Sequence, residues 1–304
     1  MTVIPLDSAR RQSVGRVDPD TGLRLPVNYR RVVSDSASAT ILDISAAHDS
    51  PPSGATCLYQ VALPYMGVFT YQVGRRSAVI DVNSVLLVPA GIEYADAHPV
   101  RGMGHALAVV APTPEVMEEI CRLVGSRPAE LFGELSQPGG GSMTLAAHRL
   151  RRLADSAGGP LEADELAVQI LREVFEAQRT PRGRPSQVVE RAKQVIHERG
   201  CERLSLADIA SAVGVSPVYL TQEFSRTEGK PLYKYQLQLR LSRALVELPY
   251  CEDIAGLALD LGFSSHSHFG AAFRRMFGVT PAEFRAGAGA VVPPPMEQMA
   301  RRRV

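Results

Sequence analysis

The chain has 304 residues and a formal net charge of +1, with 45% hydrophobic and 21% charged residues. This length accommodates about two domains, and the composition supports ordinary buried cores, which excludes a chain that is disordered throughout. The nearly neutral total charge says nothing about nucleic acid, so basic regions have to be sought locally. Residues 1–25 lack the continuous apolar segment of a secretion signal, and no run of about 18 apolar residues occurs. We therefore expect a cytoplasmic protein without membrane contact.

The first third of the chain is expected to be rich in β-structure. Residues 1–38 predict a partly disordered N-terminal arm, and residues 39–112 alternate short β-rich runs with turn signals rich in Pro and Gly. Closely spaced strands of this kind predict a small sandwich or barrel. The expected strands are Ala39–Ile44, Cys57–Leu63, Val68–Val73, Ala78–Val82, Val85–Val88 and His105–Val110.

Residues 113–178 change to a helical pattern, with apolar side chains at i, i+3 and i+4. The expected helices are Pro114–Val124, Met143–Ala154 and Ala163–Gln178. Residues 179–186 contain prolines, a glycine and several arginines, which predicts a solvated linker before residues 187–285. Residues 286–304 pass through Gly-Ala repeats and three prolines to terminal arginines, and predict a disordered tail.

Within residues 187–285, one segment has the pattern of two helices joined by a sharp turn. Ser205 is placed to cap the first helix, and Gly214 supplies the turn. Ser216 is placed to cap the second helix, in which Leu220 and Phe224 share one face. A helix, a short turn that contains glycine and a second helix form the helix-turn-helix arrangement.

The same pattern returns after an amphipathic helix expected over Pro231–Leu248. A helix over Asp253–Leu261 is followed by Gly262, and Ser264 or Ser265 is placed to cap the next helix. Aromatic side chains recur in that helix every four residues, at Phe269, Phe273 and Phe277. One such pattern occurs in many all-α cores, whereas two joined by one long helix predict a DNA-binding domain.

Residues 204–285 resemble the AraC/XylS family of bacterial transcription regulators. The matching stretches are Leu206-Ala-Asp-Ile-Ala210, Val215-Ser-Pro-Val-Tyr-Leu220, Arg240-Leu241 and Gly262-Phe-Ser-Ser-His-Ser-His-Phe269, which continues through Phe273-Arg-Arg-Met-Phe-Gly-Val-Thr-Pro-Ala-Glu-Phe-Arg285. The resemblance implies two helix-turn-helix units held by the linking helix. Their second helices would enter successive major-groove segments roughly 34 Å apart on one face of double-stranded DNA.

The expected DNA-binding residues lie at the start or on the outer face of each second helix. They are Ser216, Pro217, Val218, Tyr219, Thr221, Gln222, Ser225 and Arg226 in the first unit, and Ser265, His266, Ser267, His268, Gly270, Ala271, Arg274 and Arg275 in the second. Phosphate contacts are expected from Arg274, Arg275, Lys230 and Lys234. We expect no cofactor.

Two positions depart from the family pattern. Gln222 stands where the family often has arginine, and a glutamine amide suits adenine better than guanine. Gly270-Ala271 replaces a usual pair of a polar residue and arginine, and neither residue makes bidentate base contacts. We therefore expect the first unit to carry most base discrimination and the second to act as a phosphate anchor.

For the whole chain, the resemblance implies an α+β multidomain fold: an N-terminal cupin-like β-barrel with dimerisation helices, and a C-terminal all-α double helix-turn-helix domain. Residues 81–94 are similar to a turn-strand-Pro-Gly segment of such barrels. The implied protein is an effector-responsive activator, a homodimer and a partner of RNA polymerase. If the barrel exists, its mouth is the expected effector site, with the candidate lining residues Tyr59, Tyr65, Phe69, Tyr71 and Tyr94.

Two other classes of protein remain as alternatives. A regulator without a small ligand would respond to a protein partner or to oxidation of Cys57 or Cys121. A cupin-type metal enzyme would need clustered histidines, but His48, His98 and His105 are separated in the β-rich region, so we expect no enzyme and no metal. The cysteines, which also include Cys201 and Cys251, form no CxxC pair and are expected to be reduced structural thiols.

Overall fold

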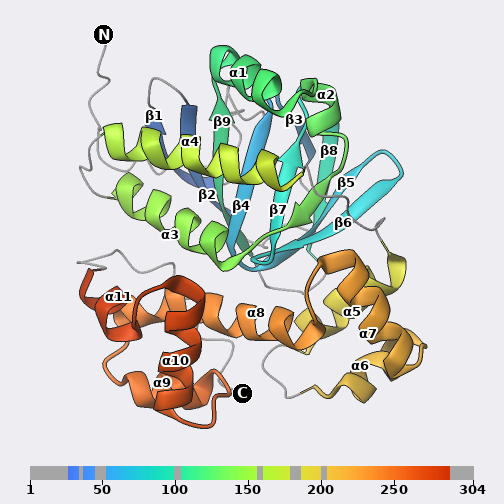
Figure 1. Cartoon of the computed structure of the whole chain (residues 1–304), viewed down its shortest axis with the longest axis vertical. Coiled ribbons are helices and arrows are strands. Elements are labelled where there is room, and N and C mark those ends of the chain that lie inside the picture. The colour runs from blue at the N-terminus through green and yellow to red at the C-terminus, as the bar shows by residue number, and fades with distance from the viewer. Residues whose placement is uncertain are drawn as a thin grey trace.

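The computed structural model describes residues 27–33, 37–44, 53–98, 104–155, 160–178, 186–199 and 204–287 (Figure 1). A β-rich part with helices packed on one of its sheets lies on one side, and an all-helical part lies on the other. Helix α8 (Leu232–Glu247) runs along the boundary between the two parts. The prediction of a β-rich N-terminal region and an all-helical C-terminal region is confirmed.

The larger sheet is antiparallel, with the strand order β1-β2-β9-β4-β7-β10. Its strands are β1 (Val27–Val33), β2 (Ala37–Ile44), β9 (His105–Pro112), β4 (Gln60–Met66), β7 (Ser84–Val88) and β10 (Ser136–Pro138). The two edge strands differ from expectation, since β1 lies in the predicted arm and β10 in the predicted helical segment. Both rest on pairing with a neighbouring strand, which no local sequence pattern reveals.

The smaller sheet has the order β3-β8-β5-β6, again antiparallel. Its strands are β3 (Ser53–Ala55), β8 (Glu93–Ala97), β5 (Val68–Val73) and β6 (Arg76–Asp81). A two-residue loop joins β5 to β6, and its first residue, Gly74, has φ 58°. Glycine suits this place because the tight turn requires a positive φ there.

No strand pairing joins the two sheets among the described residues, so these residues form two separate sheets and no closed barrel. The β-rich class is therefore confirmed, while the cupin-like barrel is not. Strand β7 is buried along its whole length. Its side chains alternate between two cores, because successive residues of a strand point to opposite faces. Leu86 and Val88 face the space between the sheets, and Val85 and Leu87 face the covering helices.

The helices that cover the larger sheet are α1 (Pro114–Val124), α2 (Pro128–Leu131), α3 (Gly141–Asp155) and α4 (Pro160–Ala177). The bounds of α1 agree with the predicted helix. Thr113 caps α1 through its side chain, and Gly125 ends it in the left-handed conformation. The short α2 was not predicted.

The all-helical part has two cores that share helix α8. The first contains α5 (Gln187–Glu198), α6 (Leu206–Val213) and α7 (Pro217–Glu228), with Leu232 and Tyr235 of α8. The second contains α9 (Ile254–Asp260), α10 (His266–Phe277) and Phe284 of α11 (Pro281–Gly287), with Leu241 and Leu245 of α8. A short 3-10 turn, η1 (Leu248–Tyr250), follows α8.

Several expectations lie outside the described residues. These include most of the predicted arm, the linker before Ser186, the tail after Gly287, and the positions of His48 and Cys201. Among the described residues, no helix is both long enough and apolar enough to cross a lipid bilayer.

Candidate nucleic-acid interface

The first candidate unit consists of α6, a short turn and α7. The Ser205 side chain accepts a hydrogen bond from the Asp208 N–H at 3.2 Å, and the Asp208 carboxylate accepts one from the Ser205 N–H at 2.9 Å. This reciprocal pair satisfies two of the free N–H groups at the start of α6. Gly214 ends α6 with φ 74°, and the Ser216 hydroxyl then accepts from the Tyr219 N–H at 3.2 Å. The predicted helix, glycine turn and helix are all present.

Helix α7 has a buried face and an exposed face. Leu220 and Phe224 are fully buried in the core of the first unit. On the opposite face, the exposed fractions of Val218 and Tyr219 are 68% and 47%. Gln222 is also exposed, and its amide has no hydrogen-bond partner among the described residues.

Other predicted residues of α7 already have intramolecular roles. Ser216 caps the helix, and Pro217 is its first residue. The Thr221 hydroxyl donates to the Pro217 carbonyl at 2.9 Å. The Arg226 guanidinium forms two hydrogen bonds with the Glu223 carboxylate, at 2.6 and 2.9 Å. Of the other predicted polar residues of α7, Tyr219 is exposed and Ser225 is half-buried, and Gln222 is the one with an exposed side-chain amide.

The second candidate unit, formed by α9 and α10, repeats this architecture. Asp253 accepts from the N–H groups of Ala255 and Gly256, each at 2.9 Å, and so caps α9. Gly262 has φ 79° in the turn, and Ser265 caps α10 by accepting from the His268 N–H at 3.1 Å. The buried face of α10 is aromatic, with Phe269, Phe273 and Phe277 in one core.

The outer face of α10 presents small and basic residues. The exposed predicted residues are His266, Ser267, His268, Ala271, Arg274 and Arg275. Neither arginine has a salt bridge in the part of the chain that the structure describes. A Cβ on Gly270 would meet none of the described residues within 4 Å, so packing among them does not explain why this residue is glycine.

The expected phosphate contact by Lys230 is wrong. Its ammonium group donates to the Gly139 carbonyl at 2.8 Å and to Gln238 Oε1 at 3.1 Å, and Asn83 Oδ1 lies 3.5 Å away. Lys230 therefore faces the β-rich part rather than a DNA surface. Lys234 is exposed.

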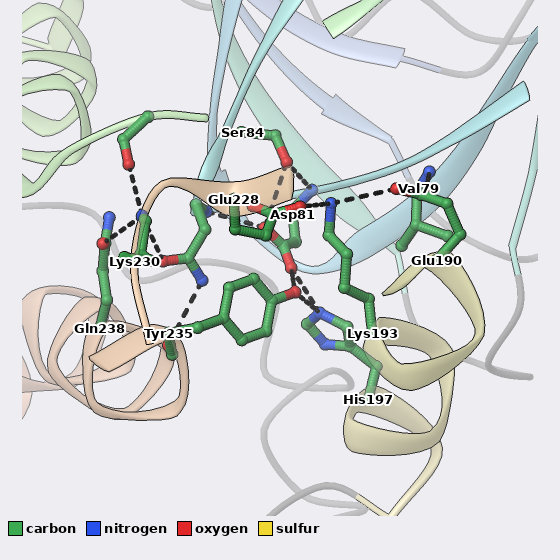
Figure 2. A network of polar contacts seen from close by, with 12 residues as sticks. Val79, Asp81, Ser84, Glu190, Lys193, His197, Glu228, Lys230, Tyr235 and Gln238 are labelled. Carbon is green, nitrogen blue, oxygen red and sulfur yellow. Dashed lines mark hydrogen bonds and ion pairs between the residues drawn. The ribbon is translucent and has the colours of Figure 1, made fainter. Parts of the chain in front are cut away.

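A polar network that was not predicted joins the two parts of the molecule (Figure 2). Asp81, at the end of β6, contacts His197 of α5 and Tyr235 of α8. These partners are 116 and 154 residues away in sequence. No motif links them, so only the fold brings them together.

The expected effector residues divide between two cores. Tyr59 and Tyr65 pack on the helix side of the larger sheet, whereas Phe69, Tyr71 and Tyr94 pack between the two sheets. The structure therefore does not bring the five together as one site.

The space between the sheets holds polar groups that were not predicted as a set. Tyr71 Oη, Asp96 Oδ1 and His105 Nε2 are buried without a hydrogen-bond partner in the described structure. Burial raises the pKa of Asp96 to about 8 and holds the pKa of His105 well below its usual range, with His98 adding to the latter effect. Nε2 of His98 lies 2.9 Å from Nδ1 of His105, so two histidines that are separated in sequence meet here.

Similar proteins were found by sequence and by structure. Residues 209–287 match a family model described as a helix-turn-helix domain. The HTH-type transcriptional regulator ArgR of Pseudomonas aeruginosa is 35% identical over 128 residues, which is 40% of this chain and 39% of that protein. The regulatory protein SoxS of Salmonella typhimurium is 34% identical over 100 residues, which is 33% of this chain and 94% of SoxS.

One solved structure is a transcriptional regulator from Chromobacterium violaceum, described as an AraC-type DNA-binding domain-containing protein. It is 36% identical, with a TM-score of 0.32, and the alignment covers 34% of this chain and 95% of that one.

Proposed function

Because the chain belongs to the AraC/XylS family of DNA-binding transcription regulators, we propose that it reads operator DNA through α7, anchors to phosphates through α10 and activates transcription in response to an effector. The first listed relatives share less than half of their length with this chain, apart from SoxS. The operator, the effector, the homodimer and the contact with RNA polymerase are therefore proposals. A cytoplasmic location follows from operator DNA as the partner.

The observation that carries this function is the exposed amide of Gln222 on a helix whose opposite face is fixed by Leu220 and Phe224. A glutamine in the major groove makes a bidentate pair with adenine, accepting from N6 and donating to N7. Because Leu220 and Phe224 are buried, the helix cannot rotate to present a different face. Arg274 and Arg275 of α10 supply the phosphate contacts, which position the protein and carry little sequence information.

The test begins with selection of tightly bound duplexes from a random pool by the full chain. Gln222→Ala is then compared with the unaltered protein on the selected sequence and on random duplex. We expect about 1–3 kcal/mol less discrimination at one base pair, with little change on random duplex. Gln187→Ala, at an exposed glutamine of α5, serves as the matched control. Equal losses of Gln222→Ala on both duplexes would contradict a base-reading role.

For effector binding, we propose the space between the two sheets as the responsive site. The supporting observation is that Tyr71, Asp96 and His105 each bury a polar atom that has no partner among the described residues. Buried polar groups normally have partners, so a bound molecule that offers both donors and acceptors would satisfy them. Tyr59 and Tyr65 are not part of this proposal, because they lie in the other core.

Thermal melting of the full chain at pH 7 tests this site against sugars, amino acids and small aromatic acids. A ligand is expected to raise the melting temperature of the unaltered protein more than that of Asp96→Asn. The pKa of Asp96 is about 8, so its side chain is mostly protonated at pH 7 and asparagine preserves its shape. Equal shifts in both proteins, or no shift with any compound, would reject the site and leave DNA binding untouched.

The two alternatives gain less support. Burial raises the pKa of the Cys121 thiol, and the charge of Glu118 raises it further, which disfavours the reactive thiolate. Cys57 is exposed and remains the better candidate for oxidation. Within the described ranges, no group of three or more His, Cys, Asp or Glu residues is arranged to hold a metal ion. The relatives named above are regulators by name, so regulation is preferred over catalysis.

A further inference from the structure

We propose that Asp81, at the end of β6, pins the core that contains the first helix-turn-helix unit (α5, α6 and α7 with the start of α8) to the β-rich part, and that this pin sets the affinity for operator DNA. The pin consists of Asp81, Glu190, Lys193, His197, Glu228 and Tyr235, called here the Asp81 cluster (Figure 2). The proposal rests on the proposed function, because it concerns how strongly the operator is bound. It adds a regulatory device that neither helix-turn-helix unit contains by itself.

The centre of the pin is a fully buried carboxylate that faces the helical part. Asp81 accepts hydrogen bonds from the Tyr235 hydroxyl and from Nε2 of His197, the latter at 2.7 Å. On its own side, Oδ1 of Asp81 accepts the Asn83 N–H at 2.8 Å. Burial alone would raise the pKa of Asp81, but His197, Lys193 and Tyr235 hold it below its ordinary value. The carboxylate is therefore charged and depends on partners from the other part of the molecule.

A second group of charges completes the cluster. Lys193, which is 4% exposed at its side chain, lies 3.0 Å from Glu228 and 3.6 Å from Glu190. Glu190 in turn accepts the Val79 N–H of β6 at 2.6 Å. The cluster thus contacts β6 through both a side chain and a backbone group. Opening the contact would leave the buried Asp81 carboxylate without its helical partners, which is costly, whereas the ion pairs of Lys193 lie within the helical part. The contact should therefore be either formed or broken, with few intermediate arrangements.

The β-rich part also contacts the second helix-turn-helix unit, mainly through its helix α3. Leu145 of α3 packs against the core of the second unit. Met276 of α10 lies against Gly141, where an added Cβ would come within 2.6 Å of its side chain. Arg151 of α3 also donates to the Tyr250 hydroxyl at 3.4 Å. The β-rich part therefore contacts both units and fixes their relative position.

This docked arrangement leaves the predicted recognition faces open. Gln222 on α7 and Arg274 on α10 are both exposed while the pin is formed. The contact therefore does not cover the DNA surface, as an inhibitory contact would. The contact instead holds the two units in place before DNA binds. This lowers the conformational-entropy cost of binding both units to one operator. Loosening the pin is expected to weaken operator binding.

The pin also connects to the interior of the β-rich part. Ile80, the residue before Asp81, is fully buried in the core between the sheets. A change in that core, such as filling it with a ligand, would displace β6 and with it the carboxylate. The strand thus provides a physical route from the proposed effector site to the first DNA-binding unit. Coupling of this kind requires an element with two discrete arrangements, whose equilibrium shifts when either site binds its partner.

The experiment compares Tyr235→Phe with Tyr233→Phe in the full chain. Tyr235 loses its hydroxyl contact to Asp81, whereas Tyr233 lies two positions earlier on α8 and is 63% exposed. Amide hydrogen exchange is measured at residues 79–84 and 193–198, together with affinity for the selected operator and for random duplex. For Tyr235→Phe we expect faster exchange on both sides of the interface and at least about fivefold weaker operator binding, as is typical of coupled sites. The control should change neither.

Each other outcome overturns the proposal. Faster exchange with unchanged affinity would mean that the interface is only structural. Tighter operator binding would mean that it is inhibitory. Unchanged exchange would mean that Tyr235 does not pin the parts together. If Tyr235→Phe fails to fold by circular dichroism, Lys230→Met takes its place with the same expectations, since it removes separate contacts to Gly139 and Asn83 across the boundary. Failure of the proposed function would appear separately, as a Gln222→Ala variant that keeps its discrimination.

Discussion

The two helix-turn-helix units share one architecture and differ in what they offer to DNA and to the rest of the chain. In the first unit, α7 exposes the Gln222 amide, and the core around this unit is tied to the β-rich part through the buried carboxylate of Asp81. In the second, α10 exposes Ala271, Arg274 and Arg275, and the unit is attached largely by apolar packing on α3. The unit proposed to read bases is thus also the one that is electrostatically pinned.

This difference teaches that duplication of a fold does not duplicate its role. A side chain that reads bases must be held in register, because a small displacement breaks a bidentate contact. Phosphate contacts tolerate such displacement, since they depend on charge more than on direction. A directional, charge-based attachment suits the first task, and a broad apolar contact is sufficient for the second.

The largest expected effect concerns these two attachments. Asp81→Asn should lower the free energy of unfolding at pH 7 by about 3–5 kcal/mol, because it removes the buried charge that accepts hydrogen bonds from Tyr235 and His197 and attracts Lys193. Met276→Ala, which removes an apolar contact of the second unit, should cost about 2 kcal/mol. Urea denaturation of the full chain measures both.

The pH dependence separates the two variants further. The pKa of Asp81 is lower in the folded chain than its ordinary value, so its contribution is present above the unfolded pKa of about 3.9 and is lost as the pH falls through the folded pKa. The difference between the unaltered chain and Asp81→Asn should therefore shrink as the pH falls below about 4. The Met276→Ala difference should stay constant, since no titrating group is removed. A constant Asp81→Asn difference at low pH would show that the carboxylate is not charged in the pin.

The next effect is on salt dependence and tests the anchoring role of α10. Arg274→Ala should weaken binding to the operator and to random duplex by the same factor and reduce the slope of log K against log salt by about 1. Gln222→Ala should leave that slope unchanged. Filter binding or fluorescence anisotropy between 50 and 200 mM salt (roughly the range in which counterion release is resolved) provides the measurement. A sequence-dependent loss in Arg274→Ala would assign base reading to the second unit as well.

The smallest effect concerns Gly270. An alanine Cβ at this position meets none of the described residues within 4 Å, and the higher helix propensity of alanine should stabilise α10 by about 1 kcal/mol. Thermal unfolding of Gly270→Ala should show this gain without loss of DNA affinity. A loss of affinity with unchanged stability would mean that DNA approaches the backbone of α10 so closely that a methyl group interferes.

The sequence predicted the local features of the fold and missed those that depend on distant pairing. The bounds of α1 and the capped helices on either side of Gly214 and Gly262 follow from side chains within a few residues of one another. Strand β10 was not predicted, because its three residues are defined by pairing with β7. The barrel expected from residues 81–94 was not found as a closed sheet.

The candidate sites divide in the same way. Exposure of Gln222, Arg274 and Arg275 follows from helix periodicity and was predictable. Lys230 was assigned to phosphate because it is a lysine near a recognition helix, and its contact with Gly139, 91 residues away, overrules that assignment. No local pattern gives Asp81 a role between the two parts of the molecule, because an aspartate at a β-turn is ordinary, and its significance comes from partners on α5 and α8.

The shared helix α8 has a consequence for how the chain tolerates change. Its first turns belong to the core of one unit and its later turns to the core of the other, with Tyr235 and Leu241 in different cores. Each residue of a helix contributes about 100° of rotation and about 1.5 Å of rise. One residue inserted between these two positions would turn the second unit by more than a quarter of a revolution relative to the first. The number of residues in α8 therefore sets the rotation of one proposed DNA contact relative to the other. Insertions or deletions in this helix should be far less tolerable than substitutions.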